Sequence, residues 1–536
     1  MITPTLHFLQ NLQSSFTSWV RSKTSQEKYG YSQVFFTLCV IFAVFWCAWL
    51  FLKPKNRSSS PLPPGPKGLP LVGNLLGLDP ELHTYFTRLS QTYGPILKLQ
   101  LGSMVGIVIS SSTLARQVLK DHEVTFANHD VPTAAQIVSY GGCDVVWTPY
   151  GPEWRMLRKV CVLKMLSKTT LDSVYVHRRQ EVRKTVNYFY SKVGSPVDVG
   201  EQIFLTTLNM ITNMIWGGTF QGDERDRLGS EFRELVSKMT EMVGKPNVSD
   251  FFPGLSRFDL QGIAKQTEGL ARRLDGIYER IIGQRRRIEE EGGEKSKDFL
   301  GFLLRLVDEQ DDKTPLTMNH LKALLGDMVV GGSDTSSKTM EFAMAEIMNQ
   351  PKVMNRIQQE LDAVIGKHNL VEESHIHQLP YLQAVVKETL RLHATAPLLV
   401  PRIPSETSIV GGYTIPKGSR IYINVWAIHR DPSNWEEPLK FDPERFLNSK
   451  WDYSGSNFSY LPFGFGRRIC VGIGMAERMI INSLATFFHC FDWEVPPGEK
   501  SDLSEKFGIV LKKKIPLVAI PKPRLSDPAL YTQCPY

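Results

Sequence analysis

Of the 536 residues, 42% are hydrophobic and 22% are charged, a composition that indicates a globular protein with a large core and excludes a disordered or fibrous chain. The formal net charge of +7 is small for this length and is not gathered in a Lys/Arg-rich arm, so the sequence predicts no nucleic-acid binding. The seven cysteines are scattered without a Cys-x-x-Cys pair, which argues against a disulfide framework or a zinc site and for a reducing compartment.

The N-terminal region predicts a membrane anchor. Residues 1–33 form a polar tail, and residues 34–52 then run without a single charged side chain. As a helix that rises about 1.5 Å per residue, this run would span roughly 30 Å, the thickness of a bilayer's hydrocarbon core. Basic residues are slightly more numerous after the run than before it, which favours a cytosolic body. The acid-poor, Ser-rich tail leaves a plastid transit peptide as the alternative.

Residues 53–77 predict a basic, proline-rich hinge, because four prolines among residues 61–66 exclude both a helix and a central strand. Residues 78–522 are interpreted as one large domain, mainly α with minor β, and residues 523–536 as a C-terminal tail. Helices are predicted from Pro80 to about Thr92 and over residues 261–288, 316–349 and 381–392. Strands are predicted over residues 96–101 and 105–110, and within 408–425 and 507–520.

A first candidate binding pair lies in the stretch 151–158. Trp154 and Arg158 are four residues apart and therefore share one face of a predicted helix. Arg402 follows Pro401 later in the chain. A guanidinium group suits carboxylates because its planar fork can bind two oxygens. The alternative for each arginine is a solvated or locally paired side chain.

The predicted helix 316–349 carries two adjacent glycines, Gly331 and Gly332, followed by Asp334 and Thr335. A glycine within a helix costs about 1 kcal/mol relative to alanine, so we expect this pair to let the backbone approach a flat ligand. An acid and an alcohol in an otherwise apolar run can pass protons to a buried oxygen species. The alternative is that both side chains bond locally to the helix backbone.

Glu388 and Arg391 are three residues apart on the predicted helix 381–392, close enough to form an ion pair. The irregular stretch 441–446 supplies a second arginine, Arg445. Taken alone, such a pair is most often a surface ion pair worth under about 1 kcal/mol.

The segment 462–474 predicts a site for a thiolate. Gly464 and Gly466 can take positive φ and so turn backbone N–H groups towards Cys470. A helix is predicted to start near Cys470, and its dipole, like the N–H groups, would lower the thiol pKa. Gly472 leaves room for a flat group. A buried apolar cysteine is one alternative; a dinucleotide-binding loop fails because no apolar strand precedes it and its third glycine is missing.

The same segment fits the pattern Phe-x-x-Gly-x-Arg-x-Cys-x-Gly at Phe463, Gly466, Arg468, Cys470 and Gly472. It resembles the haem-binding loop of the cytochrome P-450 haem-thiolate monooxygenases. The resemblance implies that Cys470 ligates the iron of haem b, that Arg468 pairs with a haem propionate, and that Phe463 and Gly472 help to hold the cofactor. The implied fold is the cytochrome P-450 fold, a single large haem domain behind an N-terminal transmembrane anchor.

The other motifs resemble elements of the same family. The order Gly-Gly-x-Asp-Thr-Ser is similar to its oxygen-activation motif, which implies that Thr335 steadies dioxygen and that Asp334 supplies protons for cleavage of the O–O bond. Three further positions resemble residues that contact the haem propionates: Trp154, Arg158 and Arg402. Three others resemble a buried triad that supports the cysteine loop, a structural role: Glu388, Arg391 and Arg445.

The resemblance also implies the reaction and the partners. One oxygen atom from O₂ would be inserted into a small apolar molecule, with electrons from NADPH through a separate NADPH–cytochrome P-450 reductase. Four basic residues are predicted to contribute to its docking face: Arg155, Lys159, Lys164 and Arg467. The anchor and the Pro-Pro-Gly-Pro hinge are similar to those of microsomal members, which implies contact with membrane lipid, a single-pass location in the endoplasmic reticulum membrane and a cytosolic catalytic domain, with a plastid membrane as the alternative.

The substrate is the least constrained prediction. Residues 244–253 and 330–332 resemble plant sesquiterpene hydroxylases, so hydroxylation of a terpenoid is preferred, with a flavonoid or another phenol as the alternative. By family position, residues 131–146, 395–399 and 507–510 would line the substrate cavity. A haem-thiolate isomerase or dehydratase that does not use O₂, or a haem carrier, is the alternative of another class, and the acid–alcohol pair argues against both.

Overall fold

The computed structural model describes residues 36–46, 60–217, 222–292, 298–309, 315–449, 451–453, 457–498 and 501–532. The chain divides into two compact units, Met1–Ser59 and Ser60–Tyr536. In the first unit, residues 36–46 are helical and belong to the predicted span 34–52, while the rest of that span and the predicted tail 1–33 lie outside the described ranges. A search of the described residues finds no helix with both the length and the apolar character that a membrane span needs.

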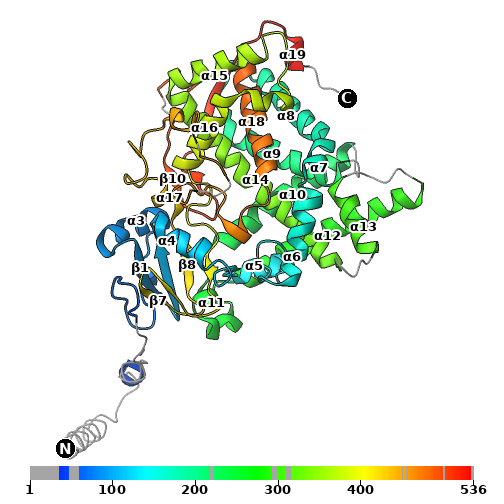
Figure 1. Cartoon of the computed structure of the whole chain (residues 1–536). Helices are drawn as coiled ribbons and strands as arrows, with labels where there is room; N and C mark the ends of the chain where they lie inside the picture. The colour runs from blue at the N-terminus through cyan, green and yellow to red at the C-terminus, as the bar shows by residue number, and fades with distance from the viewer. Residues whose placement is uncertain are drawn as a thin grey trace, which may run out of the picture. The chain divides into compact units, whose positions relative to one another are not determined.

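The second unit is mainly helical, as predicted (Figure 1). Its helices are α3 (Leu82–Tyr93), α4 (Ser112–Arg116), α5 (Thr133–Val138), α6 (Pro152–Val160), α7 (Lys168–Ser173), α8 (Tyr175–Ser191), α9 (Val199–Trp216), α10 (Gly222–Gly244), α11 (Val248–Phe251), α12 (Ile263–Glu290), α13 (Phe299–Glu309), α14 (Met318–Asn349), α15 (Pro351–Val364), α16 (Pro380–Leu392), α17 (Val425–Ile428), α18 (Ile473–Cys490) and α19 (Ala529–Thr532). Its strands are β1 (Ile96–Leu101), β2 (Met104–Ile109), β3 (Asn128–His129), β4 (Val197–Asp198), β5 (Arg402–Ile403), β6 (Ser408–Val410), β7 (Tyr413–Ile415), β8 (Arg420–Ile423), β9 (Phe491–Glu494), β10 (Glu505–Lys506), β11 (Lys512–Lys513) and β12 (Val518–Pro523).

Helix α14 runs through the middle of the helical part and packs against α9, α16 and α18 (Figure 1). The predicted long helix is therefore confirmed, and Gly331 and Gly332 do not interrupt it. It starts at Met318 because Thr317 and His320 form a reciprocal cap, in which the Thr317 hydroxyl accepts the His320 N–H at 3.2 Å. Since neighbours cover α14 on most sides, it buries apolar residues all round instead of along one stripe.

The minor β part is a five-stranded sheet in the order β1-β2-β8-β5-β3, with smaller sheets elsewhere. The predicted hairpin is confirmed, since β1 pairs antiparallel with β2 in a register that joins Ile96 to Ile109. Strand β8 then pairs parallel to β2. The short strand β5 carries Arg402 at the interior of this sheet, which places that arginine near the cysteine loop although the two are far apart in the sequence.

Both ends of the second unit extend beyond the predicted domain of residues 78–522. The Lys98 N–H donates to the Pro64 carbonyl at 2.7 Å, and the Thr414 N–H donates to the Pro61 carbonyl at 2.9 Å. The described part of the proline-rich segment is thus packed on β1 and β7, because an extended chain offers free carbonyls to neighbouring strands. At the other end, Tyr531 of α19 stacks on Tyr190 of α8 with ring centroids 4.4 Å apart.

Three predicted helix starts move by two residues, that of α14 from 316 to Met318 among them. Helix α3 begins at Leu82 because the Asp79 side chain accepts the Glu81 N–H at 2.9 Å, which forms a turn ahead of the helix. Helix α12 begins at Ile263, after Gly262 in the left-handed conformation with φ of 66°.

Candidate functional site

A cavity of about 300 Å³ lies between α14 and the loop that carries Cys470. Its wall contains most of the predicted site residues: Arg158, Thr335, Arg402, Phe463, Arg468, Cys470 and Gly472. Trp154 and Asp334 are not part of this wall, although each is next to it in the chain or in space. The fold therefore brings together residues from α6, α14, β5 and the segment before α18.

The cysteine loop has the predicted backbone. Gly464 and Gly466 have φ of 73° and 71°, in the left-handed region that favours glycine. A Cβ atom on Gly466 would lie 2.6 Å from a carboxylate oxygen of Glu123, so this position also has no room for a side chain. The Cys470 N–H donates to the Phe463 carbonyl at 3.1 Å, and the Gly472 N–H donates to Cys470 Sγ at 3.3 Å. The loop thus holds the sulfur towards the cavity.

The predicted lowering of the Cys470 pKa is wrong for the polypeptide itself. The side chain of Cys470 is open to the cavity, but the protein atoms packed around the sulfur raise the pKa of this thiol and outweigh the Gly472 N–H and the Arg158 charge, which both lower it. The helix contributes less than expected, because α18 begins only at Ile473. A metal cation on the sulfur would reverse this balance, since a coordinating thiol loses its proton.

Three arginines line the cavity and are called here the arginine cradle: Arg158, Arg402 and Arg468. Arg468 donates from Nε to the Ala127 carbonyl at 2.7 Å and from Nη2 to the Thr148 carbonyl at 2.6 Å. Arg402 donates from Nη1 to the Phe126 carbonyl at 3.1 Å. Within the part of the chain that the structure describes, no carboxylate forms an ion pair with any residue of the cradle.

The cradle makes the cavity strongly cationic. Burial lowers the pKa of Arg402 and of Arg468 to about 10, and the charge of Arg402 lowers that of Arg468 further, yet both remain protonated at neutral pH. Burial, followed by the charges of Arg402 and Arg468, holds the pKa of His129 well below its ordinary value, so this neighbour is neutral. Glu123 and Asp144 act on Arg402 and Arg468 through their charge without forming an ion pair with them, so much of the cost of burying these cations remains, and the set fits a ligand with two negative charges. With the sulfur opposite, the residues present fit a haem with its two propionates.

Trp154 supports the cradle from behind. Its indole Nε1–H donates to the Val145 carbonyl at 3.1 Å, so the ring nitrogen is already used. The guanidinium carbons of Arg468 and Arg158 lie 4.6 Å and 5.5 Å from the ring centroid. The flat face of the indole thus stabilises two neighbouring positive charges by cation–π contact.

Asp334 and Thr335 are adjacent in the sequence but point to different surroundings. The Thr335 hydroxyl lines the cavity and donates to the Gly331 carbonyl at 2.5 Å. Asp334 is 7% exposed, and its Oδ2 lies 3.4 Å from Nζ of the half-exposed Lys512 on β11. The local backbone bond that was the alternative for Thr335 is therefore present, whereas Asp334 pairs with another element.

The two glycines of α14 also have different surroundings. A Cβ atom on Gly331 would meet nothing within 4 Å, because this position opens to the cavity. A Cβ atom on Gly332 would lie 2.7 Å from Cδ1 of Ile211 and 3.1 Å from Cε of Met475. Gly331 thus leaves space for a flat ligand, and Gly332 permits close packing of α14 against α9 and α18.

Glu388, Arg391 and Arg445 form a fully connected group, called here the paired cluster. Glu388 and Arg391 are both 0% exposed, and Arg391 binds Glu388 through two bonds of 2.7 and 2.8 Å. Arg445 Nε donates to the same carboxylate at 3.0 Å. Arg391 also donates to the carbonyls of His429 and Pro438. The pair is therefore buried, and the surface ion pair considered as its alternative is wrong.

The cavity wall differs in part from the predicted lining. It includes Val145 and Val146 from the first predicted stretch and Thr395, Ala396 and Leu399 from the second, but no residue of 507–510. Sequence reasoning missed several wall residues: His129, Leu166, Asp327, Met328 and Ile480. Asp327 could have been found, because it precedes Gly331 and Thr335 at steps of four and so shares their helix face.

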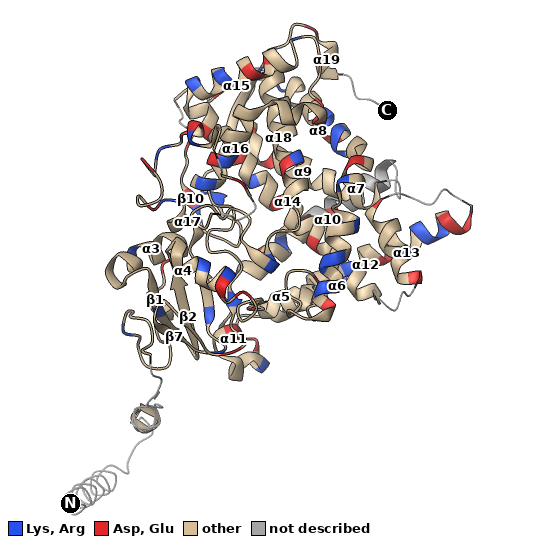
Figure 2. Cartoon of the chain, viewed as in Figure 1, with Lys and Arg blue, Asp and Glu red and all other residues tan. Residues whose placement is uncertain are grey.

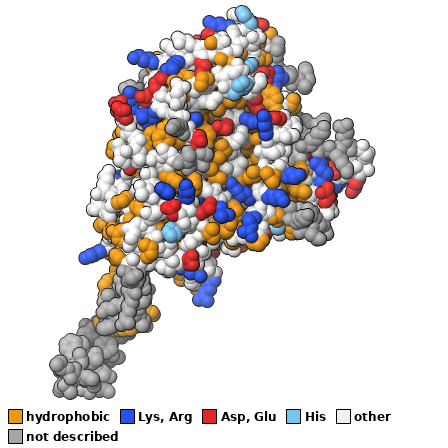
Figure 3. All heavy atoms as spheres, viewed as in Figure 1, with side chains coloured by type: hydrophobic (Ala, Val, Ile, Leu, Met, Phe, Trp, Pro, Cys, Tyr) orange, Lys and Arg blue, Asp and Glu red, His pale blue; other side chains and the backbone are white. Residues whose placement is uncertain are grey.

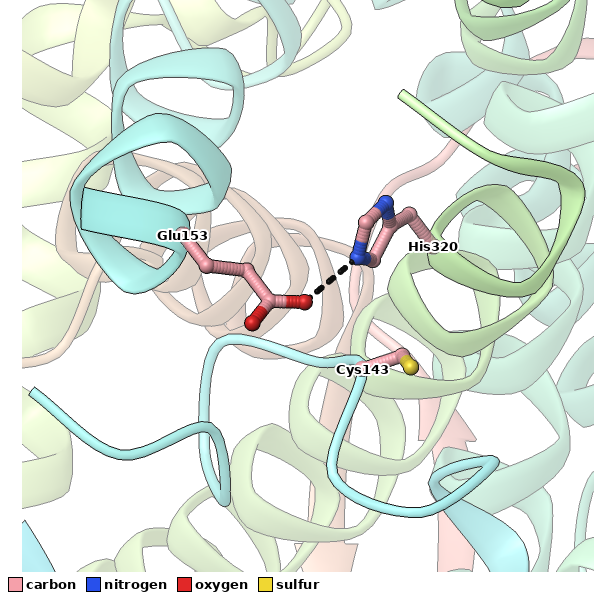
Figure 4. Close-up of side chains that lie close together, drawn as sticks. All are labelled: Cys143, Glu153 and His320. Atoms are coloured by element: carbon pink, nitrogen blue, oxygen red, sulfur yellow. Dashed lines mark hydrogen bonds and ion pairs between the residues drawn. The ribbon is translucent and has the colours of Figure 1, made fainter. Parts of the chain in front are cut away.

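A second cluster of possible metal ligands lies near the start of α14, where ligand atoms of Cys143, Glu153 and His320 are within 4.8 Å of one another (Figure 4). His320 Nδ1 accepts the Thr317 N–H at 3.1 Å, so the ring hydrogen is on Nε2. That nitrogen donates to Glu153 Oε1 at 2.8 Å. Since His320 then offers no free lone pair, the cluster is a hydrogen-bonded junction between α6 and α14.

Comparison with known proteins identifies one family and close relatives. The family described as Cytochrome P-450 matches residues 63–519. The flavonoid 3'-monooxygenases of Petunia hybrida and Arabidopsis thaliana are each 39% identical to this chain; the alignments cover 89% and 92% of this chain and 94% and 98% of theirs. Carnosic acid synthase of Salvia pomifera is 38% identical, over 91% of this chain and 98% of its own.

The fold has solved counterparts as well. A zebra fish cytochrome P-450 structure with progesterone superimposes with a TM-score of 0.69 over 83% of this chain and 100% of that chain, at 24% identity. At that identity the likeness supports the fold alone.

Proposed function

This chain belongs to the cytochrome P-450 family and is a haem-thiolate monooxygenase, and on that premise we propose that it hydroxylates a flavonoid or a related phenol. The sequence alone preferred a terpenoid, whereas the names of the relatives favour the alternative. Carnosic acid synthase, a terpenoid-related enzyme, keeps the terpenoid as the second candidate. Relatives named monooxygenases argue against an isomerase or a dehydratase.

The residues of the cavity would divide the work of holding the cofactor. Bound haem supplies the chemistry that activates O₂. Cys470 presents its sulfur as the iron ligand, and the Gly472 N–H stabilises negative charge on that sulfur. The arginine cradle binds the propionates, while Phe463 packs edge-on against Tyr453 at 5.0 Å and keeps the loop in place. The paired cluster supports this loop and takes no part in the reaction.

Asp334 and Thr335 are assigned to proton delivery. Asp334 lies beside the half-exposed Lys512, so protons from solvent reach this side of α14 first. Thr335 lies on the cavity side and can exchange its bond to the Gly331 carbonyl for a bond to dioxygen. Neighbouring positions on one helix thus connect solvent to the reacting oxygen.

The observation that carries the substrate class is a pair of hydroxyl groups in a largely apolar wall. Thr339 donates to the Thr335 carbonyl at 2.9 Å, and its Oγ1 lies 3.0 Å from Oγ1 of Thr395. A hydroxyl has one hydrogen, so Thr395 must donate to Thr339, and the lone pairs of Thr395 remain available. The cavity therefore offers a hydrogen-bond acceptor. This acceptor suits a substrate with a phenolic O–H, whereas a pure hydrocarbon has no donor that could bind to it.

The test is expression of the full chain in microsomes with a plant NADPH–cytochrome P-450 reductase and isotopically labelled O₂. Each preparation receives a flavone with a single hydroxyl on its pendant ring or a sesquiterpene hydrocarbon. We expect the flavone to gain one labelled oxygen atom, detected by mass spectrometry. Labelled product from the sesquiterpene alone would contradict the proposal and favour the terpenoid.

A matched variant sharpens this test. Thr395→Val keeps the shape of the wall but removes the acceptor. We expect the KM for the hydroxylated flavone to rise about tenfold, the value of one hydrogen bond, and the KM for its methyl ether to stay unchanged. Equal effects on both substrates would show that Thr395 does not recognise a hydroxyl.

The electron donor is proposed to be the reductase predicted from the sequence. Arg155 and Lys159 on α6 and Lys164 just after it are exposed, and basic positions are visible on α6 in Figure 2. On the face drawn in Figure 3, Lys and Arg side chains lie among exposed hydrophobic ones. Arg467 is less available for docking, because its guanidinium forms an ion pair with Glu123 at 3.2 Å. Reversing the charge of Arg155 and Lys159 should slow reduction at low salt, and unchanged reduction kinetics would contradict this docking face.

We also propose the endoplasmic reticulum membrane as the location, with the second unit in the cytosol. Two segments of this unit expose apolar side chains: Leu69, Leu71 and Leu76 in one, and Leu255, Phe258 and Leu260 in the other. Both segments reach the β1–β2 turn, where the Gly102 N–H donates to the Val72 carbonyl and the Ser103 N–H to the Phe251 carbonyl. In a chain that begins at Ser60 and so lacks the predicted anchor, replacing Leu255 and Phe258 with serine should weaken flotation with lipid vesicles; unchanged flotation would contradict a lipid contact there.

A further inference from the structure

Two aspartates that have no role in the mechanism above face each other beside the cavity. Asp144 belongs to the loop between α5 and α6, and Asp327 lies on α14, where it lines the cavity. Asp327 accepts the N–H of Val145, the residue that follows Asp144, so the two carboxyl groups lie close enough to hydrogen-bond, which they can do only when one of them carries a proton. Asp144 is 3% exposed, so water does not stabilise a second negative charge there.

Each carboxyl group also holds the backbone of the same loop. Asp327 Oδ2 accepts the Val145 N–H at 2.8 Å, and Asp144 Oδ1 accepts the Trp147 N–H at 2.6 Å. Because Asp327 belongs to α14, these bonds fasten the loop to that helix. Residues 144–148 are called here the acid-held loop.

The opposite side of the acid-held loop binds the arginine cradle. The Val145 carbonyl accepts Arg468 Nη1 at 3.0 Å, and the Thr148 carbonyl accepts Arg468 Nη2 at 2.6 Å. The Val146 carbonyl accepts His129 Nδ1 at 2.7 Å. The same peptide segment thus gives its N–H groups to the two acids and its carbonyls to the cationic side of the cavity.

We propose that Asp144 and Asp327 are positioning residues, which hold the acid-held loop against α14 by sharing one proton and thereby place the Arg468 guanidinium for the haem propionate. When that proton is lost, two negative charges lie in contact and repel, so the loop separates from α14 and Arg468 loses its carbonyl partners. The consequence is a haem that is held less firmly as the pH rises. This inference does not depend on the identity of the substrate.

The surroundings of the pair agree with one shared proton. Burial raises the pKa of both Asp144 and Asp327, and the charge of Asp144 raises that of Asp327 further. The charged or titratable groups that face the pair are Cys143, Cys161, Tyr278 and Arg468. Burial raises the pKa of Cys143, Cys161 and Tyr278, so these three stay neutral, and Arg468 stays charged. Among these groups the acids alone change charge near neutral pH.

The test measures transfer of haem from the full-length, haem-loaded protein to apomyoglobin as a function of pH. In Asp327→Asn, the amide oxygen can accept the Val145 N–H, and the amide N–H can donate to an ionised Asp144, so the contact no longer needs a shared proton. We expect the wild-type transfer rate to rise about tenfold from about pH 6 to about pH 9, and the rate of Asp327→Asn to stay constant. Asp327→Ala should release haem rapidly at every pH.

Hydrogen exchange supplies a second readout that does not depend on haem transfer. The amide of Val145 should lose protection in Asp327→Ala and keep it in Asp327→Asn, while the exposed-site control Asp308→Asn should match the wild type. The proposal is overturned if Asp327→Asn keeps the wild-type pH profile, or if Val145 stays protected in Asp327→Ala. Should Asp327→Ala fail to fold, the comparison of wild type with Asp327→Asn decides the question by itself.

Discussion

Two groups of buried and half-buried arginines in this protein look alike in the sequence and differ in what balances their charge. In the paired cluster, Arg391 and Arg445 share the carboxylate of Glu388 through several short bonds. In the arginine cradle, the hydrogen bonds that Arg402 and Arg468 make within the described part of the chain go to backbone carbonyls, and Arg468 also stacks on Trp154. A buried guanidinium needs a negative partner. Both arginines of the first group have one within the chain, the shared Glu388, whereas the second group requires an anionic ligand.

This difference in charge balance distinguishes arginines that support the fold from arginines that bind a ligand, and it needs no comparison with a relative. Carbonyl dipoles offset only part of the free-energy cost of burying a charge. A dianion that binds to the arginines offsets the rest, and this gain favours its binding. The paired cluster offers an anionic ligand no comparable gain in free energy, because its arginines already bind Glu388 and each carboxylate oxygen of Glu388 is already bonded. A change in the paired cluster should therefore affect folding, and a change in the cradle should affect cofactor retention.

The largest effect on spectrum and activity is expected from a change at Cys470. Cys470→Ala removes the iron ligand that neither group of arginines can replace, so we expect complete loss of the thiolate signal in the carbon monoxide difference spectrum and loss of monooxygenase activity. Cys39→Ser, a change at an exposed cysteine of the first unit, is the control and should leave the spectrum intact. A normal spectrum in Cys470→Ala would refute the assignment of the iron ligand.

The next largest effect should follow from breaking the paired cluster. Glu388→Gln leaves Arg391 buried without a counter-charge, and we expect the free energy of unfolding to fall by about 3–5 kcal/mol. Urea unfolding followed by tryptophan fluorescence measures this change. Glu234→Gln, which breaks the exposed pair with Lys238, should cost under about 1 kcal/mol. Similar losses in both variants would mean that burial does not distinguish them.

The same experiment on the cradle should give the opposite result. Arg402→Met removes a buried charge with no carboxylate partner, so we expect the free energy of unfolding without haem to change by less than about 1 kcal/mol. Haem dissociation should become about tenfold to a hundredfold faster, the value of one charge-assisted hydrogen bond. Arg402→Lys, which keeps the charge, should recover part of the retention. A loss of stability as large as that of Glu388→Gln would make Arg402 a structural residue.

The smallest effect concerns His393, a buried side chain that belongs to neither group of arginines. Like Arg391 in the paired cluster, it has carboxylate partners within the chain. Its imidazole lies 2.9 Å from Glu346 and 2.8 Å from Glu505. Burial lowers the pKa of His393, but these two bonds outweigh it and raise the pKa above its ordinary value of 6.5. The stabilisation of the folded state is therefore complete below pH 6.5 and is lost as the pH rises through the higher folded-state pKa.

We expect the free energy of unfolding of the wild type to decrease over that interval of pH, and His393→Gln to give a flatter profile. Urea unfolding at a series of pH values measures both curves. The other basic groups around the partners of His393 are unchanged in the variant: His83 and Arg430 contact Glu505, and Lys513 lies over Phe342, which stacks on His393. Parallel curves for the two proteins would show that His393 is not charged in the folded state.

Several local features could be predicted from the sequence because their causes lie within a few residues. The start of α16, the β1–β2 hairpin and the left-handed Gly464 and Gly466 all follow from a proline, alternation and missing side chains. The grouping of site residues was available as well, but only through a resemblance to a family, since composition and periodicity say nothing of haem.

What the sequence by itself determined is thus the set of elements and the chemical character of each motif. The tertiary structure alone decided which partners each side chain has: that Asp334 meets Lys512, that Asp144 meets Asp327, that Thr395 meets Thr339, and that the surroundings of Cys470 raise its pKa. The physical reason is distance along the chain. Backbone conformation responds to neighbours a few residues away, whereas charge balance and hydrogen bonding depend on groups that only packing brings together.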